Sequence, residues 1–591
     1  MYPTEIVDID INDVSLRDGE QAPGNTMNLQ EKLDLSLQLH RLGVNGIEAG
    51  FAIASEDDRM AIDEVAQKVG RSESPRPRQD GERYPRISSL ARLEEADIIA
   101  AISSVQTAMR RGIHVFISTS PIQRVKFERQ IRDAGGNPES DKDFVDRVIL
   151  PSIEQSMVLI RERDPGIITQ FSPEDWTRTP DNISDDVILA AAANGATIIN
   201  LPDTVGISTP DVVCRRVARV RRLLDKHGYK HVKISWHGHN DTGMGVANAI
   251  AALHGGATQF ESTILGIGER TGNFSFEGFL AALDANKEHH AERIAAMRKH
   301  PALRWFFEWI ANKPSKLEIR DTLVRTEVMN TAILVAAILG INIPREHPIV
   351  GANAFAHESG IHQDGMLKGN VYEILRPEDY GTKSRLILGK HSGWGAIKDF
   401  LETEGLPYRI TDRSSFRLAV KTAGETHGRR KGMSDTEIQR WALYPKYVEL
   451  TGGEFVTQVE DVKAEDCLHT INLHTRTNQC IEGKAISPKE GRINAIVEAM
   501  KSIIPGVDIP SGGFEVRSIR SAQAGSETLA RATVTLSNQF TVTEEAEDTD
   551  TDRAIEKALL KAFNALYAIE EYAKQVETEG AASISPKLSA S

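Results

Sequence analysis

Short apolar runs of strand length alternate with longer amphipathic stretches from residue 5 to about residue 275. Residues 29–43, for example, carry leucines at positions 29, 33 and 37 and again at 35, 39 and 42, which is helical spacing. The alternation repeats eight times, and this predicts an α/β fold of the (β/α)8 TIM-barrel type, with a doubly wound sheet as the alternative. The strand candidates are EIVDIDIN, GVNGIEAGF, RISSLA, IHVFIST, GIITQFS, ATIINLP, HVKISWH and TQFESTIL.

The chain continues well beyond this barrel, and its pattern changes twice more. We predict that the barrel occupies residues 1–285 and that a helical arm with small helical linker subdomains follows over residues 286–445. Over residues 446–575, alternating strand patterns surround the helix-like stretch INAIVEAMKSII, which predicts an α+β domain. Residues 576–591 are mostly small and polar, and we expect a disordered tail there.

Composition and charge narrow the class of protein. The 591 residues are 40% hydrophobic and 26% charged, as in ordinary globular proteins. A net charge of −14 without a basic block argues against nucleic-acid binding. The three cysteines, Cys214, Cys467 and Cys480, form no disulfide or CxxC pattern, which favours the cytoplasm. The longest apolar run, 332–340, is too short to span a membrane and predicts a buried helix.

The segment SWHGHNDTG (235–243) places two histidines directly after a predicted strand. Side chains alternate along a strand, so His237 and His239 point the same way, and catalytic groups of a barrel gather at the carboxyl ends of its strands. Two imidazoles that converge there suit a metal ion. The alternative is two unrelated histidines, each satisfied by its own hydrogen bond.

The ends of the other predicted strands favour the metal interpretation. Unpaired buried charge is costly, so charged or polar residues at nearly every strand end indicate a polar cavity. Carboxylates, imidazoles and an amide together would suit a divalent ion such as Mg²⁺, Mn²⁺ or Zn²⁺, acting as a Lewis acid. The residues concerned are Arg17, Asp18, Glu48, Arg92, Glu174, Asp203, Thr204, Glu269, Arg270 and Asn273.

Eight ordered motifs carry a resemblance that covers nearly the whole chain. They are LRDGEQAPG, IEAGFAIAS, FSPED, LPDTVG, HGHNDTGMGVAN, GIGERTGN, VGANAFAHESGIHQDGMLK and LGKHSG. Together they resemble the 2-isopropylmalate synthases, which are grouped with other metal-dependent synthases and lyases that act on acyl-CoA. The resemblance implies a divalent metal held by Asp18, His237, His239 and Asn273.

The resemblance also implies a reaction, the condensation of acetyl-CoA with 2-oxoisovalerate to give 2-isopropylmalate and CoA. Arg17 would neutralise the alkoxide that develops, and Glu174 would act beside it in the catalytic set. Glu48, Arg92 and Thr204 would help to bind the substrates.

Three further residues are implied beyond the barrel. By resemblance, His362 and Tyr372 assist proton transfer and Asp364 contributes to substrate binding. In dimers of this family, the arm that carries such residues covers the barrel of the partner subunit. We therefore expect a homodimer or a higher homo-oligomer with small-molecule substrates.

Two other activities remain open. A sibling synthase could use another 2-oxo acid, such as pyruvate or 2-oxoglutarate, and GFA and HGHND depart from the family's usual GFP and HCHND. A C–C lyase is disfavoured because that branch uses a cysteine in a loop after the last strands, and this chain has none between positions 214 and 467.

The C-terminal domain resembles the leucine-sensing domain of isopropylmalate synthases, but its two expected ligand loops differ. KEGRINA (489–495) stands where GDGPVDA is usual, so Arg492 and Ile493 replace proline and valine. EEAEDTDTDRAIEKA (544–558) is acidic and lacks the usual glycines, which let backbone N–H groups approach a ligand. We predict weak leucine inhibition or none.

Overall fold

The computed structural model describes residues 5–76, 81–299, 317–427, 442–462, 470–484, 492–511, 513–519 and 529–578. The chain divides into two compact units, one of residues 1–355 and 374–384 and one of residues 356–373 and 385–591. Each is described by itself. Within the described ranges, no helix is both long and apolar enough to cross a bilayer.

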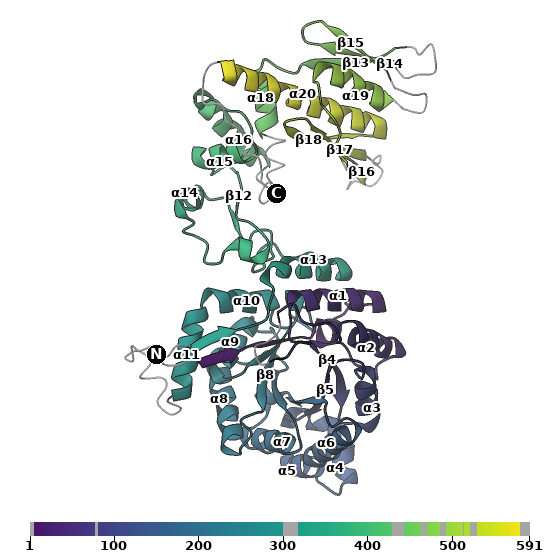
Figure 1. The fold of residues 1–591 in the computed structure, drawn as a ribbon, viewed down its shortest axis with the longest axis vertical. Coiled ribbons are helices and arrows are strands. Elements are labelled where there is room, and N and C mark those ends of the chain that lie inside the picture. Colours follow the sequence, from purple (N-terminus) through teal and green to yellow (C-terminus); the bar gives the residue numbers. More distant parts are fainter. Residues whose placement is uncertain are drawn as a thin grey trace. The chain divides into compact units, whose positions relative to one another are not determined.

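The first unit is built on a closed barrel of eight parallel strands (Figure 1), which confirms the predicted fold class. The order of the strands around the barrel follows their order in the chain, as right-handed β–α–β connections require. The strands are β2 (Asp10–Asp13), β3 (Gly46–Glu48), β4 (Arg86–Arg92), β5 (Arg110–Ser118), β6 (Ile168–Glu174), β7 (Ile198–Asp203), β8 (Lys233–Gly238) and β9 (Gln259–Ser262).

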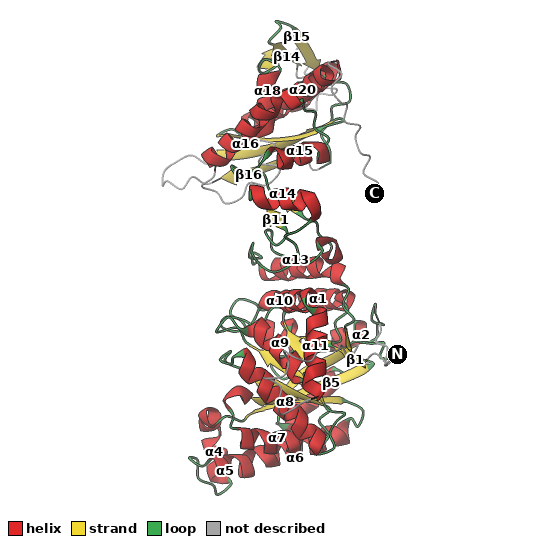
Figure 2. Ribbon diagram, turned by 90° about the vertical axis from the view of Figure 1, so that its left-hand side faces the viewer, coloured by secondary structure: helices red, strands yellow, loops and turns green. Residues whose placement is uncertain are grey.

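Helices surround the barrel on its outside (Figure 2). The first of them shows how the sequence sets its ends: Asn28 and Glu31 form a reciprocal capping box, and Gly43 ends the helix with a φ of 84°. The helices are α1 (Leu29–Leu42), α2 (Glu56–Lys68), α3 (Glu95–Ser104), α4 (Glu128–Asp133), α5 (Asp141–Phe144), α6 (Leu150–Arg163), α7 (Asp181–Ala193), α8 (Pro210–Lys226), α9 (Gly245–Gly255), α10 (Phe276–Ala285), α11 (Lys287–Lys299) and α13 (Val328–Leu339).

One expected strand is two strands in the structure. EIVDIDIN forms β1 (Glu5–Asp8) and then β2, and only β2 belongs to the barrel. β1 pairs in parallel with β10 (Leu317–Arg320), outside the barrel. An alternating pattern fixes the extended conformation, but it does not specify the partner strand, and here that partner lies about 310 residues further along the chain.

The apolar run 332–340 is helical as predicted, but α13 is not buried on all sides. Val328, Ala332 and Val335 are buried, whereas Ile333 is 52% exposed in this structure. The predicted buried helix is thus present, but it packs through one stripe of side chains only.

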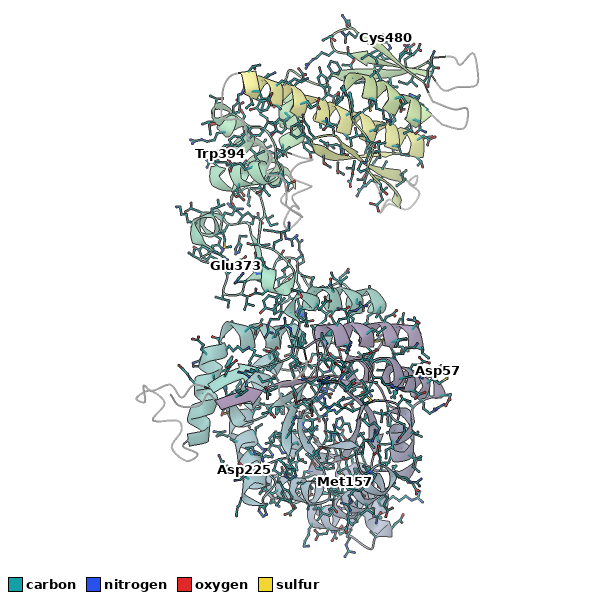
Figure 3. All side chains as sticks on the ribbon, in the orientation of Figure 1. Asp57, Met157, Asp225, Glu373, Trp394 and Cys480 are labelled. Carbon is teal, nitrogen blue, oxygen red and sulfur yellow. The ribbon has the colours of Figure 1, made fainter. Side chains whose placement is uncertain are left out.

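The second unit begins with short elements and ends in an α+β fold. The short elements are β11 (Ala356–His357), α14 (Gly360–Gly369), β12 (Arg385–Leu386), α15 (Trp394–Thr403), α16 (Arg413–His427) and α18 (Tyr444–Leu450). Figure 3 labels Glu373, Trp394 and Cys480 in this unit.

Two three-stranded antiparallel sheets complete the second unit. One contains β13 (Val456–Val462), β14 (Thr470–Thr475) and β15 (Cys480–Lys484), packed against α19 (Arg492–Ile503). The other contains β16 (Phe514–Ile519), β17 (Leu529–Ser537) and β18 (Thr541–Asp548), packed against α20 (Thr551–Thr578). α20 runs to Thr578, so the first residues of the expected disordered tail, 576–578, are helical instead. The rest of that tail, 579–591, lies outside the described residues.

Candidate metal centre and active site

Four side chains that the resemblance assigned to a metal meet at one end of the barrel. Asp18 lies in a short π-helical turn after β2, His237 is the penultimate residue of β8, and His239 directly follows that strand. Asn273 comes from the loop after β9, where a backbone bridge pairs it with His239. All four are buried, with exposed fractions of 1–6%.

The donor atoms of these residues converge. His237 Nε2 lies 3.3 Å from His239 Nε2, and His239 Nε2 lies 3.8 Å from Asp18 Oδ2. The ligand atoms that Asp18, His237 and His239 offer all lie within 4.8 Å of one another. Asn273 Nδ2 donates a hydrogen bond of 2.6 Å to Asp18 Oδ2, which adds the fourth side chain to the cluster.

The cluster fits a divalent metal ion. Asn273 Oδ1 is buried and has no hydrogen-bond partner among the residues described, although buried amide oxygens are normally paired. Two imidazole nitrogens that face each other also leave lone pairs directed at the same space. A carboxylate, two imidazoles and an amide oxygen form a mixed nitrogen and oxygen set, as Mg²⁺, Mn²⁺ and Zn²⁺ sites use.

The local environment keeps Asp18 and His239 in their ligating forms. Burial alone would raise the pKa of Asp18, but Arg17, His237 and His239 together lower it to about 2. Burial, and then the neighbouring His237, lower the pKa of His239 to about 4. At neutral pH, Asp18 is therefore a carboxylate and His239 a neutral imidazole, which metal binding requires.

Arg17 lies beside the cluster and is held by two carboxylates. Its Nη1 contacts Asp18 Oδ1 at 2.5 Å and its Nε contacts Glu48 Oε1. The other oxygen of Glu48 lies 2.7 Å from His114 Nδ1, so both oxygens of this buried carboxylate are engaged. No hydrogen bond involves Arg17 Nη2 in the described chain, which leaves this nitrogen to meet a ligand.

Glu174 and Thr204 lie at the ends of β6 and β7. Ser118 Oγ donates a hydrogen bond to Glu174 Oε2, and Lys126 Nζ lies 3.7 Å from Glu174 Oε1. Thr204 Oγ1 accepts a hydrogen bond of 3.0 Å from the backbone N–H of Asp175. Their predicted contacts with substrate stay predictions.

Arg92, at the end of β4, is bound to a neighbouring carboxylate. Its Nε and Nη2 donate hydrogen bonds of 2.7 and 3.0 Å to Asp97, and its side chain is 57% exposed. The guanidinium also lies over the ring of Phe51, 5.9 Å from the centroid. Arg92 is thus held by Asp97 and Phe51, and its contact with the substrate stays a prediction.

His362, Asp364 and Tyr372 belong to the second unit. The rings of His362 and Tyr372 stack, with centroids 4.1 Å apart and an interplanar angle of 18°. Tyr372 is 43% exposed, and Asp364 Oδ2 accepts a hydrogen bond of 2.7 Å from Lys368. The structure brings two of the three predicted residues together within that unit.

Sequence reasoning missed the polar interior of the barrel. Inward-facing residues of all eight strands are hydrogen-bonding groups that contact one another, where aliphatic side chains usually fill such a barrel. A signal exists in the sequence: polar residues alternate with apolar ones, as in QFES and TQFS, so that the polar set shares one face. The residues are Asn12, Glu48, Arg86, His114, Gln170, Ser172, Asn200, Ser235, Gln259 and Glu261.

Comparison with known proteins gives the family. The HMGL-like family model matches residues 8–302, and the model described as homocitrate synthase post-HMGL domain-like matches residues 349–427. A curated 2-isopropylmalate synthase of Synechococcus sp. is 35% identical over 568 residues, which cover 95% of each chain. The chain belongs to the 2-isopropylmalate synthase family.

Other members of the synthase family match over similar lengths. The 2-isopropylmalate synthase of Gloeobacter violaceus is 34% identical over 94% of each chain. That of Nostoc sp. is 33% identical over 96% of this chain and 98% of the relative. Among solved structures, the hydroxymethylglutaryl-CoA lyase of Pseudomonas aeruginosa is 19% identical, with a TM-score of 0.39 over 57% of this chain and 95% of the lyase.

Proposed function

We propose that the chain is a metal-dependent acyltransferase that condenses acetyl-CoA with 2-oxoisovalerate and releases 2-isopropylmalate and CoA. One observation carries the proposal: in a member of the 2-isopropylmalate synthase family, four buried donor residues converge beside Arg17 at one end of the barrel. The ligands would be Asp18, His237, His239 and Asn273, with Mg²⁺ or Mn²⁺ preferred and Zn²⁺ as the alternative.

When bound, the metal supplies Lewis-acid chemistry that polarises the keto group of the 2-oxo acid. Arg17 provides the second positive group. Its Nε and Nη1 are fixed by Glu48 and Asp18, so Nη2 meets the oxygen that becomes an alkoxide without any reorganisation. Glu174 and Thr204 lie at the ends of the neighbouring strands β6 and β7, and Arg92 lies at the end of β4, where they would orient the two substrates.

Proton transfer completes the reaction. A base removes a proton from the methyl group of acetyl-CoA, the carbon nucleophile forms a bond to the keto carbon, and the alkoxide takes up a proton. Water then cleaves the thioester, which gives the carboxylate and free CoA. The stacked pair His362 and Tyr372 supplies the proton-transfer groups in this proposal, and Asp364 contacts the substrate.

A free-thiol assay of CoA release tests the substrate. We expect 2-oxoisovalerate to give the highest kcat/KM in a panel that also contains pyruvate, 2-oxobutyrate and 2-oxoglutarate, each with acetyl-CoA and Mg²⁺. A clear preference for pyruvate or 2-oxoglutarate would instead assign a sibling synthase. CoA release without any 2-oxo acid is the control for simple thioester hydrolysis.

We further propose a homodimer in which each second unit completes the active site of the partner subunit. This is testable because His237 and His362 lie in different units. His237→Ala and His362→Ala should each be inactive, and mixed subunits should regain about a quarter of the wild-type activity, because one of the two sites in a heterodimer is intact and half of the dimers are mixed. Verified heterodimers without activity would show that each chain completes its own site.

A further inference from the structure

Glu261 is a fully buried carboxylate that the proposed reaction does not use. It lies on β9, between Asn12 of β2 and His237 of β8, which are its register partners on the two neighbouring strands. In parallel strands, such neighbours project their side chains to the same face. Glu261 therefore lies beside a proposed metal ligand because of the strand register, and no loop is needed to bring it there.

The contacts of Glu261 divide between its two oxygens. Oε2 lies 3.1 Å from His237 Nδ1 and accepts a hydrogen bond of 3.1 Å from Asn200 Nδ2. Oε1 accepts hydrogen bonds from Gln170 Nε2 at 2.5 Å and from Asn12 Nδ2 at 3.3 Å. Three amide groups thus hold the carboxylate, and one face of Oε2 is left for the imidazole.

The amides are fixed in turn by a buried guanidinium. Arg86 donates hydrogen bonds of 3.1 Å to Gln259 Oε1 and 3.0 Å to Asn12 Oδ1, and Gln259 Nε2 donates one of 2.7 Å to Gln170 Oε1. Arg86 is only 5% exposed. Its charge also compensates part of the cost of burying a carboxylate in the barrel. The side chain of Glu261 consequently has little freedom to turn away from His237.

The two proposed histidine ligands differ in this respect. His237 Nε2 faces His239 Nε2, while its Nδ1 faces Glu261 Oε2. Both Nδ1 atoms are buried and neither makes a well-formed hydrogen bond in the described part of the chain, so the two rings differ in the carboxylate oxygen that lies 3.1 Å from His237 Nδ1. A neutral imidazole carries one N–H, and the nitrogen without it binds the metal. A carboxylate beside Nδ1 favours the tautomer that leaves Nε2 free.

We propose that Glu261 is a positioning residue, which fixes the ring and the tautomer of His237 so that Nε2 is presented to the metal. The inference rests on the proposed metal site. Its energetic basis is general: a carboxylate behind a ligating histidine makes the imidazole a better donor, and loss of such a partner typically weakens metal affinity by 10- to 100-fold.

Metal affinity of the full-length protein provides the test. Glu261→Gln keeps the shape of the side chain but removes its charge. Titration of Mn²⁺ into the metal-free protein should give a dissociation constant about 10- to 100-fold higher than that of the wild type. With Co²⁺ as the probe, the visible absorption bands should shift, since a merely structural change would not alter the field around the ion. Thermal unfolding of the metal-free variant should stay close to that of the wild type.

Glu277→Gln is the matched control. Glu277 is equally buried, but it contacts the Leu265 N–H and His347, and neither residue is a proposed metal ligand. It should leave the Mn²⁺ affinity unchanged. Wild-type affinity in Glu261→Gln, with no tight binding in His237→Ala, would overturn the role of Glu261 and keep the metal site. Wild-type affinity in His237→Ala would instead overturn the site itself.

A second variant tests the proposal even if Glu261→Gln does not fold. Asn200→Ala removes the amide that donates to Glu261 Oε2 and touches no proposed ligand. We expect its Mn²⁺ affinity to fall by about three- to tenfold, less than the loss of the carboxylate itself. An unchanged affinity in this variant would equally overturn the proposal.

Discussion

At the scale of single residues, the charge of a buried carboxyl group depends on the groups that it contacts. Glu261 accepts hydrogen bonds from three amides and lies beside His237, so its buried carboxylate stays ionised: although burial raises its pKa, the nearby His114 and His237 lower it below its usual range. Glu277 is equally buried but has no cation of this kind, and burial raises its pKa to about 7. At neutral pH, equal burial therefore leaves Glu261 ionised and Glu277 only partly ionised.

The pKa of Glu277 predicts a specific pH dependence of stability. A carboxyl group with a pKa of about 7 in the folded chain and about 4.5 when unfolded holds its proton longer in the folded state. The contribution of Glu277 to stability is therefore most favourable below about pH 4.5 and falls as the pH rises through 7. Between pH 5 and pH 8 this group should cost about 2–3 kcal/mol.

Glu277→Gln removes this loss. The amide can still accept the Leu265 N–H and can donate to His347 Nε2, which lies 3.4 Å from Glu277 Oε2. We expect the variant to gain stability relative to the wild type as the pH rises from 5 to 8, measured as the denaturant midpoint of the barrel's unfolding transition. Parallel pH profiles of the two proteins would refute the assignment.

The sequence identified some of these residues and not others, for a physical reason. Asp18, His237 and Asn273 stand in loops or at strand ends, where a charged group has no structural purpose that the local pattern explains. Glu261 and His114 lie within strands, and the partners that identify their role come from other strands. Only the closed barrel brings those partners together.

At the scale of elements, the loop after β9 is the most constrained part of the site. Leu265 and Arg270 both have a positive φ, as do Gly266, Gly268 and Gly272. A Cβ atom added to Gly272, whose φ is 82°, would lie 2.0 Å from the backbone oxygen of Gly266. This loop carries Asn273, so its unusual backbone directly sets the place of a proposed ligand.

Gly272→Ala should therefore weaken metal binding. The new methyl group forces Gly266 and its neighbours to move, which displaces Asn273, and we expect a loss of Mn²⁺ affinity of at least about tenfold together with a loss of turnover. Gly228→Ala is the control, because Gly228 also has a positive φ (88°) but nothing lies within 4 Å of the added Cβ. It should cost about 1–2 kcal/mol of stability without an effect on the metal. Equal metal affinities in both variants would contradict the argument.

The elements also show which features of the fold hydrophobic periodicity predicts and which it does not. Eight alternating runs predict the eight barrel strands because each run must bury one face against helices. Periodicity did not reveal that residues 5–8 leave the barrel to pair with 317–320, because the choice between partners depends on contacts that are distant in sequence. The same holds for α13, whose sequence is largely apolar while only one stripe of its side chains is buried.

At the scale of the whole molecule, the C-terminal domain raises the question of control. Arg492, at the start of α19, lies 2.9 Å from Asp461 and 3.1 Å from Glu556, so a residue that replaces the usual proline takes part in ion pairs. The preceding residues, 485–491, lie outside the described ranges. The second expected ligand loop is a strand and a helix here: residues 541–548 form β18, and α20 begins at Thr551.

We therefore expect leucine to inhibit weakly or not at all. β18 carries Glu544, Glu545, Glu547 and Asp548, and of these Asp548 is bound by Lys557 at 2.6 Å and Glu547 by Arg531 at 2.5 Å. A regular strand offers its N–H groups to β17 instead of to a ligand, and a strand rich in carboxylates is a poor site for the carboxylate of an amino acid. To test this, initial rates of CoA release are measured with leucine from about 1 µM to about 10 mM, and with valine and isoleucine as controls. Calorimetry of leucine binding to the same full-length protein separates binding from inhibition. Inhibition by micromolar leucine, absent with the two controls, would show that this domain senses leucine in spite of its altered loops.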